Sequence, residues 1–90
     1  MNHSELCRKI AEYLKTLPRC WFVRPVQFGY SRRGVPDFIV CLDSNFLAIE
    51  VKVGRDKLSI MQDREMKDIF SAGGATVIAR SLDDVKERLK

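Results

Sequence analysis

The sequence predicts an α/β protein in which helices flank one four-stranded mixed sheet, with the element order α-β-β-β-α-β-α. Apolar residues recur at helical spacing in three stretches, near residues 4–17, 59–72 and 81–89. Two apolar strand-like runs, 37–42 and 46–53, enclose a short polar turn, and a β-branched run, 75–79, follows the middle helix. A strand reached through a helix pairs in parallel by a right-handed crossover, whereas a hairpin is antiparallel, so the sheet is mixed.

The first helix and the first strand are predicted from their ends. Ser4 can cap the helix, and Pro18 closes it. Residues 20–28 are rich in aromatic and β-branched residues, but Pro25 cannot donate a ladder hydrogen bond. This first strand is therefore expected at an edge of the sheet or with a bulge.

The runs 37–42 and 46–53 are predicted to form a hairpin around Asp43-Ser44-Asn45. Both runs are nearly continuous in apolar residues, as in sheets that are covered on both faces. We therefore place them at the centre of the sheet, with helices above and below.

Two capping signatures mark the remaining helices. Ser59 with Gln62 three residues later is a capping box that opens the second helix, which should stop at Gly73-Gly74. Ser81 with Asp84 opens the last helix in the same way.

Length and composition indicate a single domain, residues 1–90, with a modest core that dimerisation would help. Hydrophobic residues at 46% and charged residues at 31% are usual for globular proteins, and no apolar run approaches the ~20 residues of a membrane span. No secretory signal is readable in the first twenty residues. We expect a cytoplasmic protein, in the host cytoplasm if a virus or prophage encodes it, with no membrane partner.

The cysteines and the histidine give little indication of function. Cys7, Cys20 and Cys41 lie among apolar neighbours without CxxC spacing, which favours buried reduced thiols over disulfides or a zinc site. His3, the only histidine, lies near the terminus, where no role is expected for it.

The charge balance favours a polyanionic partner. Sixteen Lys and Arg against twelve Asp and Glu give a formal charge of +4 and a pI near 9.2. Residues 19–33 carry four arginines and no acid, interleaved with aromatic residues. This segment is a candidate rim for phosphate contacts.

A constellation of charged residues lies inside the predicted hairpin. Antiparallel pairing brings Asp37 and Glu50 to the same end of the sheet, and alternation places Lys52 on the face of Glu50. Two carboxylates with a main-chain carbonyl, such as that of Val51, form an oxygen site suited to Mg²⁺ or Mn²⁺. A lysine beside such a site can hold a scissile phosphate, so the parts required for phosphodiester hydrolysis are present.

A structural explanation competes with this one. Glu50 and Lys52 can be the solvated face of an amphipathic strand, and Asp37 after Pro36 can be a turn residue. The apolar neighbours on both sides of Glu50 imply burial instead, and buried charges need partners or a metal.

The motif order resembles a known family. Pro36-Asp37 in "GVPD" and Glu50-Val51-Lys52 in "IEVK" match the PD-(D/E)XK nuclease signature. The later "KLSIMQ", "SAGGATVIARS" and "LDDV" are similar to the VRR-NUC branch, the virus-type replication-repair nucleases. The resemblance covers about residues 4 to 87 and implies a restriction-endonuclease-like core.

The resemblance also implies roles for individual residues. Asp37, Glu50 and the Val51 carbonyl would be metal ligands, Lys52 the catalytic lysine, and Gln62 a catalytic polar residue opening the next helix. Family members often add a glutamate from the first helix, for which Glu5 is the candidate; the alternative is a surface glutamate.

The loop before the motif is assigned to DNA. Tyr30, Arg32 and Arg33 are expected to contact the backbone, although a solvated loop with two arginines is the alternative. Gly34 is expected to permit the turn that positions Asp37.

The sequence thus predicts a homodimeric Mg²⁺-dependent DNA endonuclease, in which Mn²⁺ can substitute, acting on branched DNA such as Holliday junctions without a small-molecule cofactor. Alternatives are a catalytically silent nucleic-acid-binding module of the same fold, a structural subunit of a larger complex, or a nuclease on flaps, duplex ends or RNA. The intact Asp37, Glu50 and Lys52 disfavour the first two alternatives.

Overall fold

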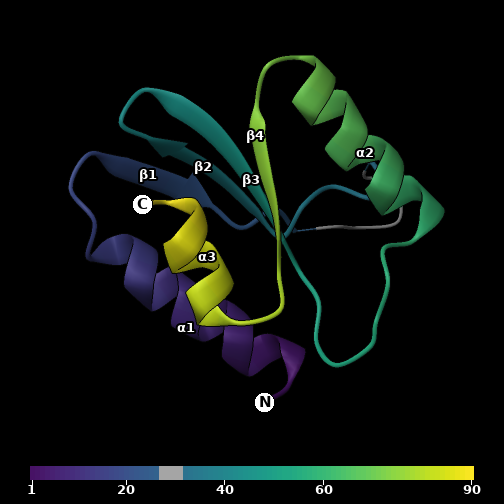
Figure 1. The fold of residues 1–90 in the computed structure, drawn as a ribbon, viewed down its shortest axis with the longest axis horizontal. Helices are drawn as coiled ribbons and strands as arrows, with labels where there is room; N and C mark the ends of the chain where they lie inside the picture. Colours follow the sequence, from purple (N-terminus) through teal and green to yellow (C-terminus); the bar gives the residue numbers. More distant parts are fainter. Residues whose placement is uncertain (27–31) are drawn as a thin grey trace.

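The computed structural model describes residues 1–26 and 32–90 and has the predicted order of elements (Figure 1). The elements are α1 (His3–Lys15), β1 (Cys20–Val23), β2 (Phe38–Leu42), β3 (Asn45–Val51), α2 (Ile60–Ser71), β4 (Ala75–Ala79) and α3 (Leu82–Arg88). None of the helices in these described ranges is long and apolar enough to span a bilayer.

The four strands form one mixed sheet in the order β1-β2-β3-β4. β1 pairs with β2 and β2 with β3 in antiparallel fashion, whereas β3 and β4 are parallel. The mixed α/β sheet with the hairpin strands at its centre is therefore confirmed, and β1, which precedes Pro25, is an edge strand as predicted.

The hairpin turn fixes how the two central strands face each other. Asp43 and Ser44 both have positive φ angles, 50° and 74°, as the two central residues of a tight hairpin turn require. The register that follows pairs Leu42 with Asn45 and Phe38 with Ile49.

Helices α1 and α3 pack beside each other against one face of the sheet, and α2 lies beside β4 outside this layer (Figure 1). The main core lies under α1 and α3, where Phe38, Ile49 and Val85 are fully buried. The opposite face is covered less completely, because Trp21 on β1 is 61% exposed. This layering leaves the end of the hairpin that carries Asp37 close to the start of α1.

Several predicted boundaries differ from the structure. Asn2 caps α1 instead of Ser4, and its side chain accepts a hydrogen bond from the Glu5 amide. β1 ends at Val23, before Arg24 and Pro25, and the predicted continuation through residues 27 and 28 lies outside the described part of the chain. β3 ends at Val51, although the Lys52 amide still donates to the Ala79 carbonyl.

The predicted caps of α2 and α3 are confirmed, whereas the predicted burial of the cysteines is confirmed only in part. Ser59 with Gln62 forms a reciprocal capping box, and Ser81 caps α3. All three cysteines are free: Cys7 is buried, Cys20 is half-buried and Cys41 is exposed, so the prediction of burial holds only in part for Cys20 and is wrong for Cys41. Cys41 lies on the face of β2 that α1 and α3 do not cover, and the strand's apolar composition does not distinguish its two faces.

Candidate active site

Asp37 and Glu50 lie opposite each other at one end of the hairpin. The register pairs Phe38 with Ile49, so the next step outward places Asp37 across from Glu50. The backbone amide of Val51 donates to Asp37 Oδ2 at 2.8 Å, which holds this carboxylate against the end of β3. The two acids therefore meet as the hairpin pattern predicted.

The two carboxyl groups differ sharply in their electrostatics. Burial, then hydrogen bonding and charge repulsion from Asp37, raises the pKa of Glu50 to about 9. Burial also acts to raise the pKa of Asp37, but hydrogen bonds from Glu50, the Val51 amide and His3 outweigh it, and the pKa lies below its ordinary value. At neutral pH, without a cation, Asp37 is ionised and Glu50 holds a proton.

Glu50 is the buried acid of this site. Its side chain is only 2% exposed, and its Oε2 atom has no hydrogen-bond partner among the residues that the structure describes. A buried oxygen without a partner is costly, so the fold maintains this arrangement at the expense of stability. Such an arrangement is typical of functional sites.

Lys52 lies on the same side of the sheet as Glu50. Ile49, Val51 and Val53 pack in or against the core, so the alternate positions Glu50 and Lys52 face the other way. The positive charge of Lys52 acts to lower the pKa of Glu50, which indicates that the two groups interact. The predicted Glu-x-Lys face is thus present in the structure.

The residues present fit a hard divalent cation. Asp37 and Glu50 supply carboxylate oxygens, and one buried Glu50 oxygen has no partner within residues 1–26 and 32–90. A divalent cation next to Glu50 would favour its charged form and satisfy this oxygen. Assignment of the Val51 carbonyl as a third ligand stays a prediction.

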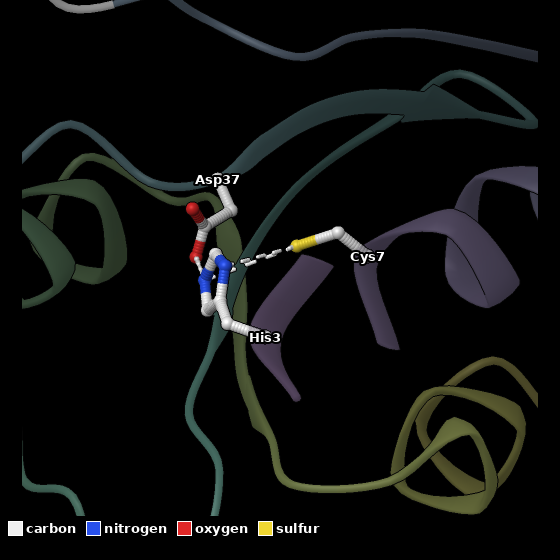
Figure 2. Close-up of side chains that lie close together, drawn as sticks. All are labelled: His3, Cys7 and Asp37. Atoms are coloured by element: carbon white, nitrogen blue, oxygen red, sulfur yellow. Dashed lines mark hydrogen bonds and ion pairs between the residues drawn. The ribbon is translucent and has the colours of Figure 1, made fainter. Parts of the chain in front are cut away.

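His3, for which no role was expected from the sequence, contacts this site. Its Nε2 atom lies 3.4 Å from Asp37 Oδ2 (Figure 2), because α1 begins two residues earlier than predicted and His3 belongs to its first turn. Cys7, one turn further along α1, is fully buried beside it. Glu5, the predicted ligand from this helix, is exposed, and its role at a metal stays a prediction.

The loop that precedes Asp37 packs against α2. Gly34 has a φ of +78°, and a Cβ atom added there would lie 2.5 Å from the Met61 carbonyl, so the close approach needs glycine. Arg32 pairs through Nε with Glu65, a buried acid of α2 that the sequence analysis missed. The Arg32 side chain is otherwise exposed.

Three predicted residues remain to be placed. Arg33 is exposed, as a DNA contact requires, whereas Tyr30 lies outside the described residues. The Gln62 side chain accepts a hydrogen bond from the Ser59 amide, so its observed function is to cap α2. Catalytic roles for Gln62 and DNA contacts of Arg32 and Arg33 stay predictions.

Comparisons with known proteins find similar structures but no similar sequences. No family model and no curated protein matches the sequence. A solved structure described as a VRR_NUC domain has a TM-score of 0.79 at 21% identity and covers 97% of this chain and 92% of that chain. A second, described as a VRR_NUC domain protein, has a TM-score of 0.77 at 18% identity and covers 99% and 85%.

A third similar structure is Hjc from Archaeoglobus fulgidus, described as a Holliday junction resolvase from an archaeal hyperthermophile. Its TM-score is 0.64 at 21% identity, with 87% of this chain and 67% of that chain covered. Together these likenesses show that the chain has the fold of a VRR-NUC domain. The resemblance inferred from the motifs is confirmed at the level of the fold.

Proposed function

We propose that this chain is a metal-dependent DNA endonuclease that acts on branched DNA as a homodimer. The observation that carries the proposal is the position of Asp37 across from Glu50, with Lys52 on the same side. A structural role alone does not account for Glu50, because a buried carboxyl whose Oε2 atom finds no partner in the described part of the chain destabilises the fold.

Asp37 and Glu50 would hold Mg²⁺, or Mn²⁺ in its place. When bound, such an ion supplies a more acidic water and offsets negative charge on a phosphate. Asp37 is already ionised and held by the Val51 amide, so it provides the fixed ligand. Glu50 loses its proton to solvent on binding.

Lys52 acts on the phosphate itself. An ammonium group beside the scissile phosphodiester stabilises the charge that develops in the transition state. Lys52 follows the end of β3 and is partly exposed, so it can reach a backbone that lies across this end of the sheet.

Branched DNA is the substrate class that we favour. One of the similar solved structures is described as a Holliday junction resolvase. Three arginines of the segment 19–33 lie near Asp37, because Arg24 lies over Phe38 and Arg32 and Arg33 precede Asp37 in the chain, whereas Arg19 pairs with Asp43 at the opposite end of the hairpin. These arginines can bind phosphates without reading sequence, so selectivity would come from the shape of the junction.

A direct test presents four-way junctions, flaps, duplex ends, single strands and RNA to the wild type with Mg²⁺, Mn²⁺ or EDTA. We expect cleavage of four-way junctions in either metal and none in EDTA. Asp37→Ala should lose both cleavage and calorimetric Mn²⁺ binding, whereas Asp43→Ala, an exposed acid in the hairpin turn, should keep both. Tight DNA binding without cleavage of any substrate would instead support a catalytically silent binding module.

A further inference from the structure

We propose that His3, Cys7 and Asp37 form a binding site for a borderline transition-metal ion of the Zn²⁺ class, which shares Asp37 with the oxygen site at Asp37 and Glu50 but adds a nitrogen and a sulfur donor. One ligand atom from each of the three side chains lies within 4.8 Å of the others. The side chains converge from the first turns of α1 and from the residue before β2 (Figure 2).

The spacing in α1 explains why two of the donors meet. His3 and Cys7 are four residues apart, so they share one face of the helix. Two ligands at i and i+4 on a helix are a known way to hold one metal ion. Asp37 completes the set from the residue before β2, where the hydrogen bond from the Val51 amide holds its carboxylate in place.

Two of the three ligand-to-ligand distances match the edges of a tetrahedral site. Zinc bond lengths place a nitrogen and an oxygen ligand about 3.4 Å apart, and a nitrogen and a sulfur ligand about 3.6 Å apart. His3 Nε2 lies 3.4 Å from Asp37 Oδ2, and Cys7 Sγ lies 3.7 and 3.8 Å from the two ring nitrogens. Cys7 Sγ and the Asp37 oxygen lie within 4.8 Å of each other, so a side-chain shift of about 1 Å would close the third edge.

The donor types decide which ion fits. Thiolate and imidazole ligands favour Zn²⁺ and similar ions, whereas Mg²⁺ prefers oxygen donors. Burial, followed by the charge of Asp37, raises the pKa of the Cys7 thiol, and Arg24 nearby acts against this rise. The thiol is thus protonated without metal, and its proton passes to solvent when the sulfur–metal bond forms.

The side chains also leave a route for the ion. Cys7 is fully buried, but the side chains of His3 and Asp37 are 47% and 25% exposed. An ion can approach between them, and its remaining coordination position can hold water. A site with three protein ligands and an open fourth position is one of the two common zinc arrangements.

Because the two metal sites share Asp37, ion binding at one should affect the other; this consequence rests on the proposed nuclease function. An ion held by His3, Cys7 and Asp37 withdraws the Asp37 carboxylate from the hard-cation site. Zn²⁺ should therefore inhibit cleavage in Mg²⁺ by competing for this residue.

The test uses the full chain, freed of metal and kept reduced without a thiol. Zn²⁺ is titrated by calorimetry, and Co²⁺ is followed by its thiolate charge-transfer absorption and by the visible bands of tetrahedral cobalt. We expect one Zn²⁺ per chain and a cobalt–thiolate band in the wild type. Cys7→Ser should remove the band, and His3→Gln should weaken Zn²⁺ binding at least about tenfold.

Controls separate this site from the other thiols and from misfolding. Cys41→Ser should keep the band and the Zn²⁺ affinity, since this exposed cysteine lies on β2. Because Cys7 is buried and its replacement can perturb the core, His3→Gln, at a largely exposed side chain, provides the second variant. Zn²⁺ affinity unchanged in His3→Gln, or no Zn²⁺ binding by the wild type, would overturn the proposal.

The test also distinguishes failure of the site from failure of the nuclease proposal. The proposed site stands if Zn²⁺ binds through His3 and Cys7 even in a protein that cuts no DNA. Conversely, Mg²⁺-dependent cleavage by a wild type that does not bind Zn²⁺ refutes the site and leaves the nuclease proposal intact.

Discussion

At the scale of single residues, Asp37, which precedes β2, is the point at which α1 and β3 meet. Its carboxylate accepts from the Val51 amide, lies near His3 of α1 and interacts with Glu50 of β3. These contacts keep Asp37 ionised. Glu50 therefore holds the proton of the pair, and its pKa rises from its ordinary 4.5 to about 9. The site is therefore prepared for a cation at the expense of stability.

Glu50→Gln should stabilise the metal-free protein at neutral pH. The raised pKa means that native Glu50 keeps its proton between about pH 4.5 and 9, whereas in the unfolded chain this carboxyl ionises near pH 4.5. The contribution of the protonated Glu50 side chain to stability is thus fully present below about pH 4.5. This contribution is lost as the pH rises toward 9, because the unfolded chain releases the proton and the native protein does not. Glutamine has no proton to lose, so the gain at pH 7.5 should be on the order of 1–3 kcal/mol.

Urea unfolding in EDTA at pH 5 and pH 8 measures this effect. Stability of the wild type should fall between the two pH values more than that of Glu50→Gln, and the lowered pKa of Asp37 acts only at more acidic pH. Glu12→Gln, at an exposed residue of α1, is the matched control. An equal fall in Glu50→Gln and wild type would show that Glu50 is not held neutral.

The sequence predicted the acids of the site but not its histidine. Asp37, Glu50 and Lys52 lie on one hairpin, so alternation and a two-residue turn fix their relation. His3 and Cys7 depend instead on where α1 begins and how it crosses the sheet, which is set by tertiary packing. The i, i+4 spacing of His3 and Cys7 was the available signal.

At the scale of elements, the loop before β2 positions the site. Gly34 lies against the first turn of α2, and Arg32 pairs with Glu65 of the same helix. The cap of α2 was predictable because Ser59 and Gln62 form a complete local signature. The cap of α1 was not, since Asn2 and Ser4 are both good capping residues and local pattern does not choose between them.

Gly34→Ala should be strongly destabilising. The added methyl group would combine a positive φ with a clash against the Met61 backbone, which cannot move away as a flexible side chain would. We expect a loss of about 2–4 kcal/mol in the free energy of unfolding. Gly54→Ala is the control, because Gly54 also has a positive φ, +58°, but nothing lies within 4 Å, so its cost should be about 1 kcal/mol. Equal losses in the two variants would refute the close packing of this loop on α2.

At the scale of the whole molecule, one face of the sheet is left apolar and open. The register places Trp21, Cys41 and Phe46 in one row across β1, β2 and β3, and all three are exposed. Directly paired residues point to the same face, so the row is continuous. Exposed apolar rows of this kind are typical of interfaces, and we predict that the homodimer forms here.

Light scattering at micromolar concentration should therefore give about twice the 10.4 kDa chain mass. Trp21→Glu would place a charge in the interface and should yield monomers. Phe70→Glu, at an exposed position of α2, is the comparison and should remain dimeric. A wild type that is monomeric with and without DNA would contradict the dimer, and dissociation by Phe70→Glu alone would move the interface to α2.

The central claim is that Asp37, Glu50 and Lys52 form a site that cleaves DNA, and Lys52→Ala tests it most directly. Rates of four-way junction cleavage in Mg²⁺ are measured together with junction affinity, with Lys15→Ala, at an exposed residue in the last turn of α1, as the control for lost charge. Affinity should change little in both variants, because many phosphate contacts share the binding energy. Cleavage should fall on the order of a hundred- to a thousandfold in Lys52→Ala and remain near wild type in Lys15→Ala. Cleavage by Lys52→Ala at the wild-type rate would contradict the account.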